Sequence, residues 1–264
     1  MSELDLQFLQ WRTGDGAGYL TLKRPPLNVV NIAMLREMIS ALEAAAQDST
    51  MRVLVLNAEG TLRVFSAGVD VADHTADKVG EMIPLFDRVC VALADFPTPT
   101  LAVVHGHALG GGCELALCCD LIVAAEGANF GQPEIKLATI APIAALRLPG
   151  AVGYRRAAEL LFTGDTVGAA EAARIGLINR AVPASELDQV AGQYVGKLRG
   201  LSAAALRACK RAARLGASFG PAQDGWANLP AIEKLYLEEL MSTEDAHEGV
   251  ASFIEKRAPV WKNR

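Results

Sequence analysis

The sequence predicts an α/β fold in which short buried strands alternate with amphipathic helices. Short apolar runs, such as residues 52–57 and 101–104, suit strands that a parallel sheet buries on both faces. Longer runs with apolar residues at helical spacing stand between them, so the order strand, helix, strand recurs along the chain. With 264 residues, 51% of them hydrophobic, the chain is long enough for one large domain, or for a domain plus a helical appendage.

The first part of the chain predicts three strands and two helices. Asn31 has the side chain of an N-cap, and the residues after it place apolar side chains on one helical face. A second amphipathic run ends where Pro97 and Pro99 prevent a helix from continuing. The predicted elements are strands at residues 18–22, 52–57 and 101–104, a helix that starts after Asn31, and a helix at residues 78–95.

The later part of the chain becomes helical. We expect helices throughout from Ser185, broken at Pro221 and Pro230, and we place a boundary near residue 195. This gives a core domain at residues 1–195 and a helical oligomerisation region at residues 196–264, whose apolar side chains should pack on the core or on another subunit. Before the boundary, the predicted elements are strands at 121–125, 128–130 and 177–182, a charge-poor loop at 138–149, and helices at 150–162 and 168–175.

The chain is acidic, with a formal net charge of −5 and a pI near 5.5. This balance disfavours a nucleic-acid surface. A basic stripe on one predicted helix face is interpreted as solvated, with contact to an anion or, less favoured, to nucleic acid as the alternative; it consists of Arg207, Lys210, Arg211 and Arg214. No apolar run approaches the length of a membrane span, and the N-terminus lacks a basic leader. We therefore expect a cytoplasmic protein with neither nucleic acid nor membrane as a partner.

The five cysteines are odd in number and include no C-x-x-C spacing, so we expect buried free thiols. His105 and His107 could pair as ligands on a strand, but no third ligand stands at a recognisable spacing. The sequence therefore predicts no metal site.

Three consecutive glycines at residues 110–112 stand between a strand and a helix. Without Cβ atoms, the backbone there can approach a ligand closely. The first N–H groups of the helix are unpaired and carry partial positive charge, so a developing anion is favoured beside Gly111. Glu114 lies three residues later on the same helical face, either as a catalytic acid or merely as a complement to the helix dipole.

Two further stretches have the same ambiguous character. Residues 65–70 (FSAGVD) form a small-residue loop after a strand, suited either to close ligand approach or to a plain tight turn. Glu134 follows Glu114 by 20 positions and precedes the charge-poor loop, so it is either a second acid in a dry pocket or a surface carboxylate.

Taken together, these stretches resemble the enoyl-CoA hydratase/isomerase (crotonase) superfamily. The resemblance implies a spiral of ββα turns with a C-terminal helical region that forms trimers, often paired into hexamers. It implies a coenzyme A thioester as substrate, and no cofactor apart from the coenzyme A of that substrate. The matching motifs are RPPLN at 24–28, FSAGVD at 65–70, ALGGGCELA at 108–116, GQPE at 131–134 and FIEKR at 253–257.

The resemblance also implies roles for individual residues. The N–H groups of Ala67 and Gly111 would form an oxyanion hole, and Glu114 and Glu134 would be the two catalytic acids, with the acid and base roles unassigned. Coenzyme A or its acyl group would contact a further set, in which the last two residues come from the same or a neighbouring subunit: Leu27, Gly68, Val69, Asp70, Val71, Pro142, Phe253 and Lys256.

Residues 139–149 (TIAPIAALRLP) depart from the superfamily's usual proline and glycine-rich turn. The Ala-Pro-x-Ala-Ala pattern is similar to the subfamily of cyclohexa-1,5-diene-1-carbonyl-CoA hydratases, which implies hydration of a cyclic dienoyl thioester in anaerobic aromatic breakdown. The alternatives are a straight-chain enoyl-CoA hydratase of β-oxidation, an enoyl-CoA isomerase, a hydrolase of a ring ketone, and a catalytically silent scaffold that binds coenzyme A. Because both acids and both glycine loops are intact, the sequence favours an enzyme.

Overall fold

The larger of two sheets has six strands in the order β1-β2-β3-β5-β7-β10. The computed structural model describes residues 6–60, 63–217 and 228–264. β1 is antiparallel to β2, whereas every later pair of neighbours is parallel. The strands are β1 (Leu9–Gly14), β2 (Ala17–Leu22), β3 (Val53–Ala58), β5 (Thr100–Val104), β7 (Leu121–Ala125) and β10 (Arg180–Val182).

A smaller sheet runs beside the first in the order β4-β6-β8-β9. Its first three strands are parallel, and β9 is antiparallel to β8. From β3 to β8, three successive turns of the chain each add one strand to the larger sheet and then one to the smaller, which confirms the predicted α/β spiral of ββα turns. The strands are β4 (Val64–Ser66), β6 (His107–Leu109), β8 (Asn129–Gly131) and β9 (Thr166–Gly168).

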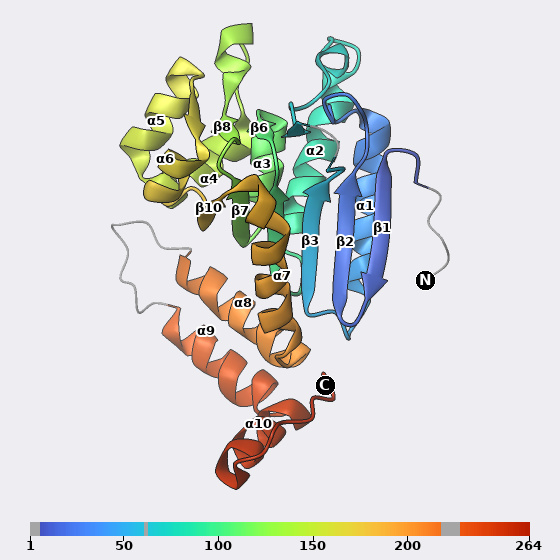
Figure 1. Ribbon diagram of the computed structural model, residues 1–264, viewed down its shortest axis with the longest axis vertical. Coiled ribbons are helices and arrows are strands. Elements are labelled where there is room, and N and C mark those ends of the chain that lie inside the picture. The colour runs from blue at the N-terminus through green and yellow to red at the C-terminus, as the bar shows by residue number, and fades with distance from the viewer. Residues whose placement is uncertain (1–5, 61–62, 218–227) are drawn as a thin grey trace.

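Helices cover both faces of the larger sheet (Figure 1). Alternate residues of β3 point to opposite faces, so Leu54 and Leu56 join the main core while Val53 and Val55 join a second cluster. α1 and α2 complete the main core, and α7 completes the second cluster. The bounds are α1 (Ile32–Ala46), α2 (Val79–Ala94) and α7 (Leu187–Arg199). As predicted, Asn31 caps α1 by accepting a 2.9 Å hydrogen bond from the Met34 N–H.

The remaining helices of the core are short. α3 (Gly111–Leu117) is buried along its whole length, whereas α5 and α6 lie at the edge near the smaller sheet (Figure 1). The others are α4 (Pro142–Val152), α5 (Tyr154–Thr163) and α6 (Ala169–Arg174), with 3-10 turns at Val71–Asp73, Pro133–Leu137 and Ala184–Glu186.

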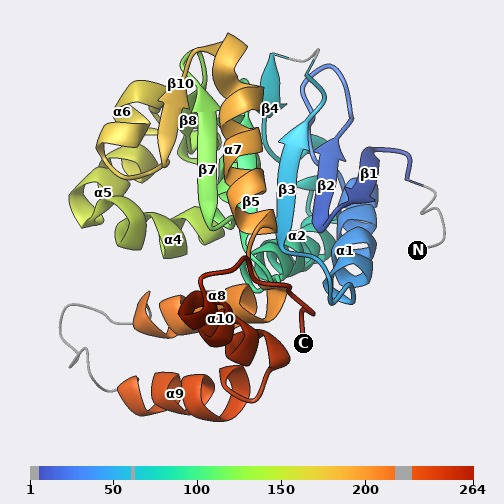
Figure 2. The same cartoon turned by 60° about the horizontal axis from the view of Figure 1, so that its bottom comes forward.

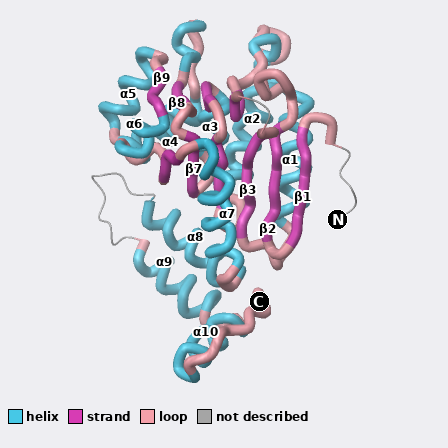
Figure 3. The backbone as a smooth tube through the Cα atoms, in the orientation of Figure 1, coloured by secondary structure: helices cyan, strands magenta, loops and turns pink. Residues whose placement is uncertain are grey.

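After α7, the described chain continues as helices and loops without strands (Figure 3). These helices lie together beyond one end of the sheets (Figure 2). They are α8 (Ala203–Ala217), α9 (Leu229–Lys234), a π-helical continuation at Leu235–Leu240, and α10 (Glu244–Glu255). The predicted boundary at residue 195 falls within α7, which packs on the larger sheet. Pro230 lies in the first turn of α9 rather than at a break, and Pro221 lies outside the described residues.

Three of the four basic residues on α8 are paired with the core, so the interpretation as a solvated face is wrong for them and holds only for the exposed Arg211. Lys210 is buried, with Nζ 2.7 Å from Asp120 Oδ2 and donating to the Thr98 carbonyl at 3.2 Å. Burial lowers the pKa of Lys210, and the Asp120 carboxylate opposes that effect. The other pairings are Arg207 to the Ser49 carbonyl at 2.7 Å, Arg214 to Asp95 at 2.6 Å, and Arg211 to Glu239.

Several predicted elements differ from the structure. β1 was not predicted, because this edge strand is mostly exposed and mixes polar with apolar residues. The segment 138–149, expected to be a loop, enters a helix at Pro142, a residue that suits the first helical turn. β6 stands between β5 and the glycines, and the predicted strand at 177–182 is reduced to Arg180–Val182.

Four cysteines are free and buried as expected, but Cys209 is exposed. Within the described ranges, no three His, Cys, Asp or Glu side chains are placed to hold a metal ion. No helix in these same ranges is long and apolar enough to cross a membrane.

Candidate active site

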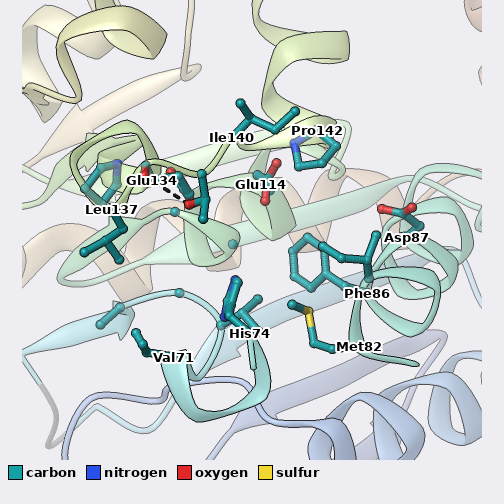
Figure 4. A pocket seen from close by; sticks show the side chains of 18 of the residues that line it. Val71, His74, Met82, Phe86, Asp87, Glu114, Glu134, Leu137, Ile140 and Pro142 are labelled. Atoms are coloured by element: carbon teal, nitrogen blue, oxygen red, sulfur yellow. Dashed lines mark hydrogen bonds between the residues drawn. The ribbon is translucent and has the colours of Figure 1, made fainter. Parts of the chain in front are cut away.

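A cavity of about 440 Å³ lies between α2, α3, the loop after β4 and the start of α4. Figure 4 shows the side chains that line it, among them both predicted acids. Of the residues predicted for the site, the cavity brings together Ala67, Gly68, Val69, Val71, Gly111, Glu114, Glu134 and Pro142.

Two predicted residues support the cavity without lining it. The Leu27 carbonyl accepts the Ala67 N–H at 3.0 Å. The Asp70 carboxylate accepts from Arg24 Nη2 and from the Ala72 N–H, both at 3.1 Å, and so holds the loop and the following 3-10 turn.

Phe253 and Lys256 do not reach this cavity. Phe253 is on α10, at the opposite end of the molecule from α3 (Figure 1), and its side chain is 85% exposed. Lys256 follows as the C-cap of α10. Their contact with coenzyme A stays a prediction, and the distance of α10 from the cavity favours a contact made from a neighbouring subunit.

The start of α3 fits closely against the loop after β4 because of its glycines. A Cβ on Gly112 would overlap the Ser66 carbonyl oxygen, and one on Gly111 would lie 2.7 Å from Val69 Cγ2. Gly68, with φ of +107°, brings the loop alongside the Gly111 nitrogen. This contact places the N-terminus of α3 and the loop backbone at the same cavity wall.

The predicted oxyanion donor Ala67 is wrong, because its N–H already donates to the Leu27 carbonyl. The next candidate along the loop is Val69. The Val30 N–H donates to the Gly68 carbonyl, and the Val30 carbonyl accepts from the Asp70 N–H, both at 2.8 Å. Neither hydrogen bond uses the Val69 N–H. In the described part of the chain, no hydrogen bond uses the N–H of Val69 or that of Gly111. These two donors are therefore the available pair.

Glu114 projects from the first turn of α3 and is 3% exposed. Its Oε1 accepts a 2.8 Å hydrogen bond from the Ala144 N–H at the start of α4. Burial raises the pKa of Glu114 to about 7, with a smaller contribution from the charge of Glu134. Near neutral pH this carboxyl group can therefore hold or release a proton.

Glu134 reaches the same cavity from the 3-10 turn Pro133–Leu137. A Cβ on Gly110 would overlap its Oε1, so the absence of a side chain at residue 110 makes room for this carboxyl group. Its Oε2 is buried and has no hydrogen-bond partner in the structure. Burial raises the pKa of Glu134 as well, although the nearby His74 opposes this. Both acids of the cavity therefore have pKa values above their ordinary ones.

Gly110→Ala is expected to lower kcat by about a hundredfold or more, because it displaces the Glu134 carboxyl group. The substitution also strains the backbone, since φ at Gly110 is +52°. Steady-state kinetics on an enoyl-CoA thioester, with circular dichroism to confirm folding, provide the measurement. Gly127→Ala is the control, because a Cβ there meets nothing within 4 Å. Equal activity of both variants would show that the position of Glu134 does not depend on Gly110.

The α2 wall of the cavity and His74 were not predicted. Residues 78–95 were identified only as an amphipathic helix, yet Met82, Phe86 and Asp87 of this helix line the cavity (Figure 4). Helical periodicity predicts which side chains point inward, but it does not distinguish a packed core from a cavity wall. Leu137 and Ile140 complete the wall on the opposite side.

This arrangement suits the polarisation of a carbonyl group next to a proton transfer. Two N–H donors and the dipole of α3 can stabilise negative charge on a carbonyl oxygen. Two carboxyl groups with raised pKa values can exchange protons with a water molecule and a substrate carbon.

A family model described as enoyl-CoA hydratase/isomerase matches residues 12–264. The chain is 39% identical to cyclohexa-1,5-dienecarbonyl-CoA hydratase of Thauera aromatica, with 100% of both chains covered. It is 36% identical to 2,3-dehydroadipyl-CoA hydratase of Escherichia coli, over 93% of this chain and 94% of that one. A crystal structure of Bacillus anthracis enoyl-CoA hydratase matches with a TM-score of 0.91 and 30% identity, covering 98% of this chain and 100% of the other. The chain therefore belongs to the enoyl-CoA hydratase/isomerase family of enzymes, as its motifs indicated.

Proposed function

We propose that the protein adds water to the conjugated double bond of a cyclic dienoyl-CoA thioester, cyclohexa-1,5-diene-1-carbonyl-CoA. The observation that carries the proposal is the buried carboxyl group of Glu114 and the half-buried one of Glu134, which share a cavity with two free backbone N–H donors. Its 39% identity with the Thauera aromatica hydratase over the whole chain supports the cyclic acyl group. The reaction would be one step in the anaerobic breakdown of aromatic compounds.

The thioester oxygen would accept hydrogen bonds from the Val69 and Gly111 N–H groups. Glu114 and Glu134 would hold one water molecule between them. One carboxylate takes a proton from this water as its oxygen attacks the β carbon, and the thioester oxygen gains the negative charge of an enolate. In a simple enoyl thioester, the other carboxyl group would then give its proton to the α carbon. The reaction needs no cofactor apart from the coenzyme A of the substrate.

The acyl group would lie against an apolar wall made by α2 and the start of α4. Met82 and Phe86 contribute from α2, and Ile140 and Pro142 from the opposite side (Figure 4). The α4 segment replaces the glycine-rich turn of ordinary hydratases, so it changes the shape of the space beside the reacting carbons. A ring is wider than a linear chain, and we infer that this wall accommodates it.

The coenzyme A part of the substrate would lie along Leu27 and residues 67–71. We further propose a homotrimer or a dimer of such trimers in the cytoplasm. In this assembly, Phe253 and Lys256 of a neighbouring subunit would cover the adenine and meet a phosphate. The 85% exposure of Phe253 suits such a contact across subunits.

A straight-chain enoyl-CoA hydratase is the second candidate, because the same two acids and two N–H donors would serve a linear substrate. An isomerase needs only one acid to move a proton, so the second carboxyl group in the cavity disfavours it. A scaffold without activity has no use for two acids in one cavity, because burial makes their charged forms costly.

The test compares hydration of cyclohexa-1,5-diene-1-carbonyl-CoA with hydration of crotonyl-CoA, followed by absorbance. We expect kcat/KM to favour the cyclic thioester by at least about tenfold, which is a difference of about 1.4 kcal/mol in transition-state binding. A preference for crotonyl-CoA would contradict the cyclic substrate and favour the second candidate. No hydration of either thioester would contradict both.

A further inference from the structure

We propose that Asp87 is a third catalytic carboxyl group, which donates a proton to the ring of a cyclic conjugated dienoyl thioester at the carbon farthest from the attacked position. This inference rests on the proposed function, because only a substrate with a second conjugated double bond has such a carbon. It assigns a residue to the choice of product, which neither Glu114 nor Glu134 accounts for.

Asp87 occupies an unusual position for a carboxyl group. It lines the cavity from α2, beside Phe86 and among otherwise apolar side chains such as Met82 and Ile83. Within the described residues its carboxylate makes no hydrogen bond and no ion pair, although its charge contributes to the raised pKa of Glu114. Burial raises the pKa of Asp87 itself. Its carboxylate therefore has no contact that would give it a structural role. A partly desolvated acid that faces a substrate cavity is typical of a functional residue.

The three carboxyl groups are spread along the cavity. Figure 4 shows Glu134 on one side, Asp87 on the other and Glu114 between them. Glu134 and Glu114 would serve the water molecule at the β carbon. Asp87 lies beyond Glu114, on the side toward α2, where the far part of a ring would extend.

The chemistry of a conjugated ring gives this position a use. The α carbon carries the thioester, and the second double bond begins at the neighbouring ring carbon on the side away from the β carbon. When water oxygen bonds to the β carbon and its proton passes to a glutamate, the π electrons delocalise over the thioester oxygen and the second double bond. Protonation at the outer carbon of that second bond restores a double bond conjugated with the carbonyl.

That outer carbon lies across the six-membered ring from the β carbon. A proton donor for it must therefore stand on the opposite side of the cavity from the acids that hold the water. In this step the O–H bond of Asp87 breaks, a C–H bond forms at the outer carbon, and the electron pair returns from the oxygen to re-form the carbonyl. After product release, the glutamate loses its extra proton to solvent and Asp87 regains one.

The experiment is hydration of cyclohexa-1,5-diene-1-carbonyl-CoA in D₂O by the wild-type enzyme and by Asp87→Asn, with NMR to locate deuterium in the product. We expect deuterium at the outer carbon in the wild-type product and a loss of about a hundredfold in kcat for the variant. Binding of cyclohexanecarbonyl-CoA, a saturated analogue, should stay within about twofold of wild type, because the role of Asp87 is in proton transfer. Glu81→Gln, an exposed acid on the same helix, should change neither readout.

Three results would overturn the inference while leaving the hydratase activity in place. These are deuterium at the α carbon in the wild-type product, an unchanged kcat for Asp87→Asn, and a loss of analogue binding as large as the loss of rate. The failure of the proposed function is distinct from these. In that case the wild-type enzyme would hydrate crotonyl-CoA but not the cyclic thioester, and the role assigned to Asp87 would fall with it.

Discussion

Glu114→Gln and Glu134→Gln are each expected to reduce kcat for hydration by about 10³-fold. Glutamine keeps the size of the side chain but cannot take up or release the proton of the attacking water. The cavity should still bind the thioester, so KM should change by less than about tenfold. Steady-state kinetics on the thioester that the wild-type enzyme prefers provide the measurement.

The double variant separates a catalytic pair from two independent acids. If both carboxyl groups act on one water molecule, removing the second should cost much less than removing the first. Glu126→Gln is the matched control, because Glu126 is an exposed acid outside the cavity. A single variant with near wild-type kcat would contradict the two-acid mechanism and favour chemistry that uses one acid.

Lys210→Ala is expected to lower the free energy of unfolding by about 2 to 4 kcal/mol. Lys210 is 6% exposed at its side chain and ties α8 to the core through Asp120 and the Thr98 carbonyl. Its loss leaves the Asp120 carboxylate without its cation. We expect the loss in the free energy of unfolding to lie near the lower end of this range, because the Asp120 side chain is 30% exposed and keeps hydrogen bonds from the Thr100 N–H and hydroxyl. Urea unfolding at a fixed protein concentration measures the change.

Two variants test whether the loss comes from the buried charge pair. Arg211→Ala removes an exposed ion pair with Glu239 from the same helix and should cost less than about 1 kcal/mol. Asp120→Asn combined with Lys210→Met removes both charges and should recover part of the loss, because apolar packing replaces the lysine stem. If Lys210→Ala cost no more than Arg211→Ala, the pair would not hold α8 on the core.

Much of the fold could be predicted from local patterns in the sequence. Some signals depend only on residues that are close together in the sequence. These are the Asn31 cap, the apolar spacing of α1 and α2, and the continuous apolar runs of β3, β5 and β7. Where a segment lacks such a local signal, the prediction failed. β1 is mostly exposed, so its polar residues concealed an edge strand that is defined only by its pairing with β2. The segment after Pro142 is nearly uniformly apolar, and its helical state follows from packing against α3 and α5.

The sequence by itself determined the family, the α/β spiral and the candidate acids Glu114 and Glu134, because these depend on residue types at fixed spacing in short motifs. Tertiary structure alone decided which N–H groups are free. The Leu27 carbonyl, forty residues away in the chain, accepts the Ala67 N–H, whereas Val30 pairs with Gly68 and Asp70 and leaves the Val69 N–H available. Packing of α8 also decided that Lys210 is buried, and the shape of the cavity gave Asp87 a place beside the acids. These features depend on contacts between residues that are distant in the sequence, and a local sequence pattern does not contain information about such contacts.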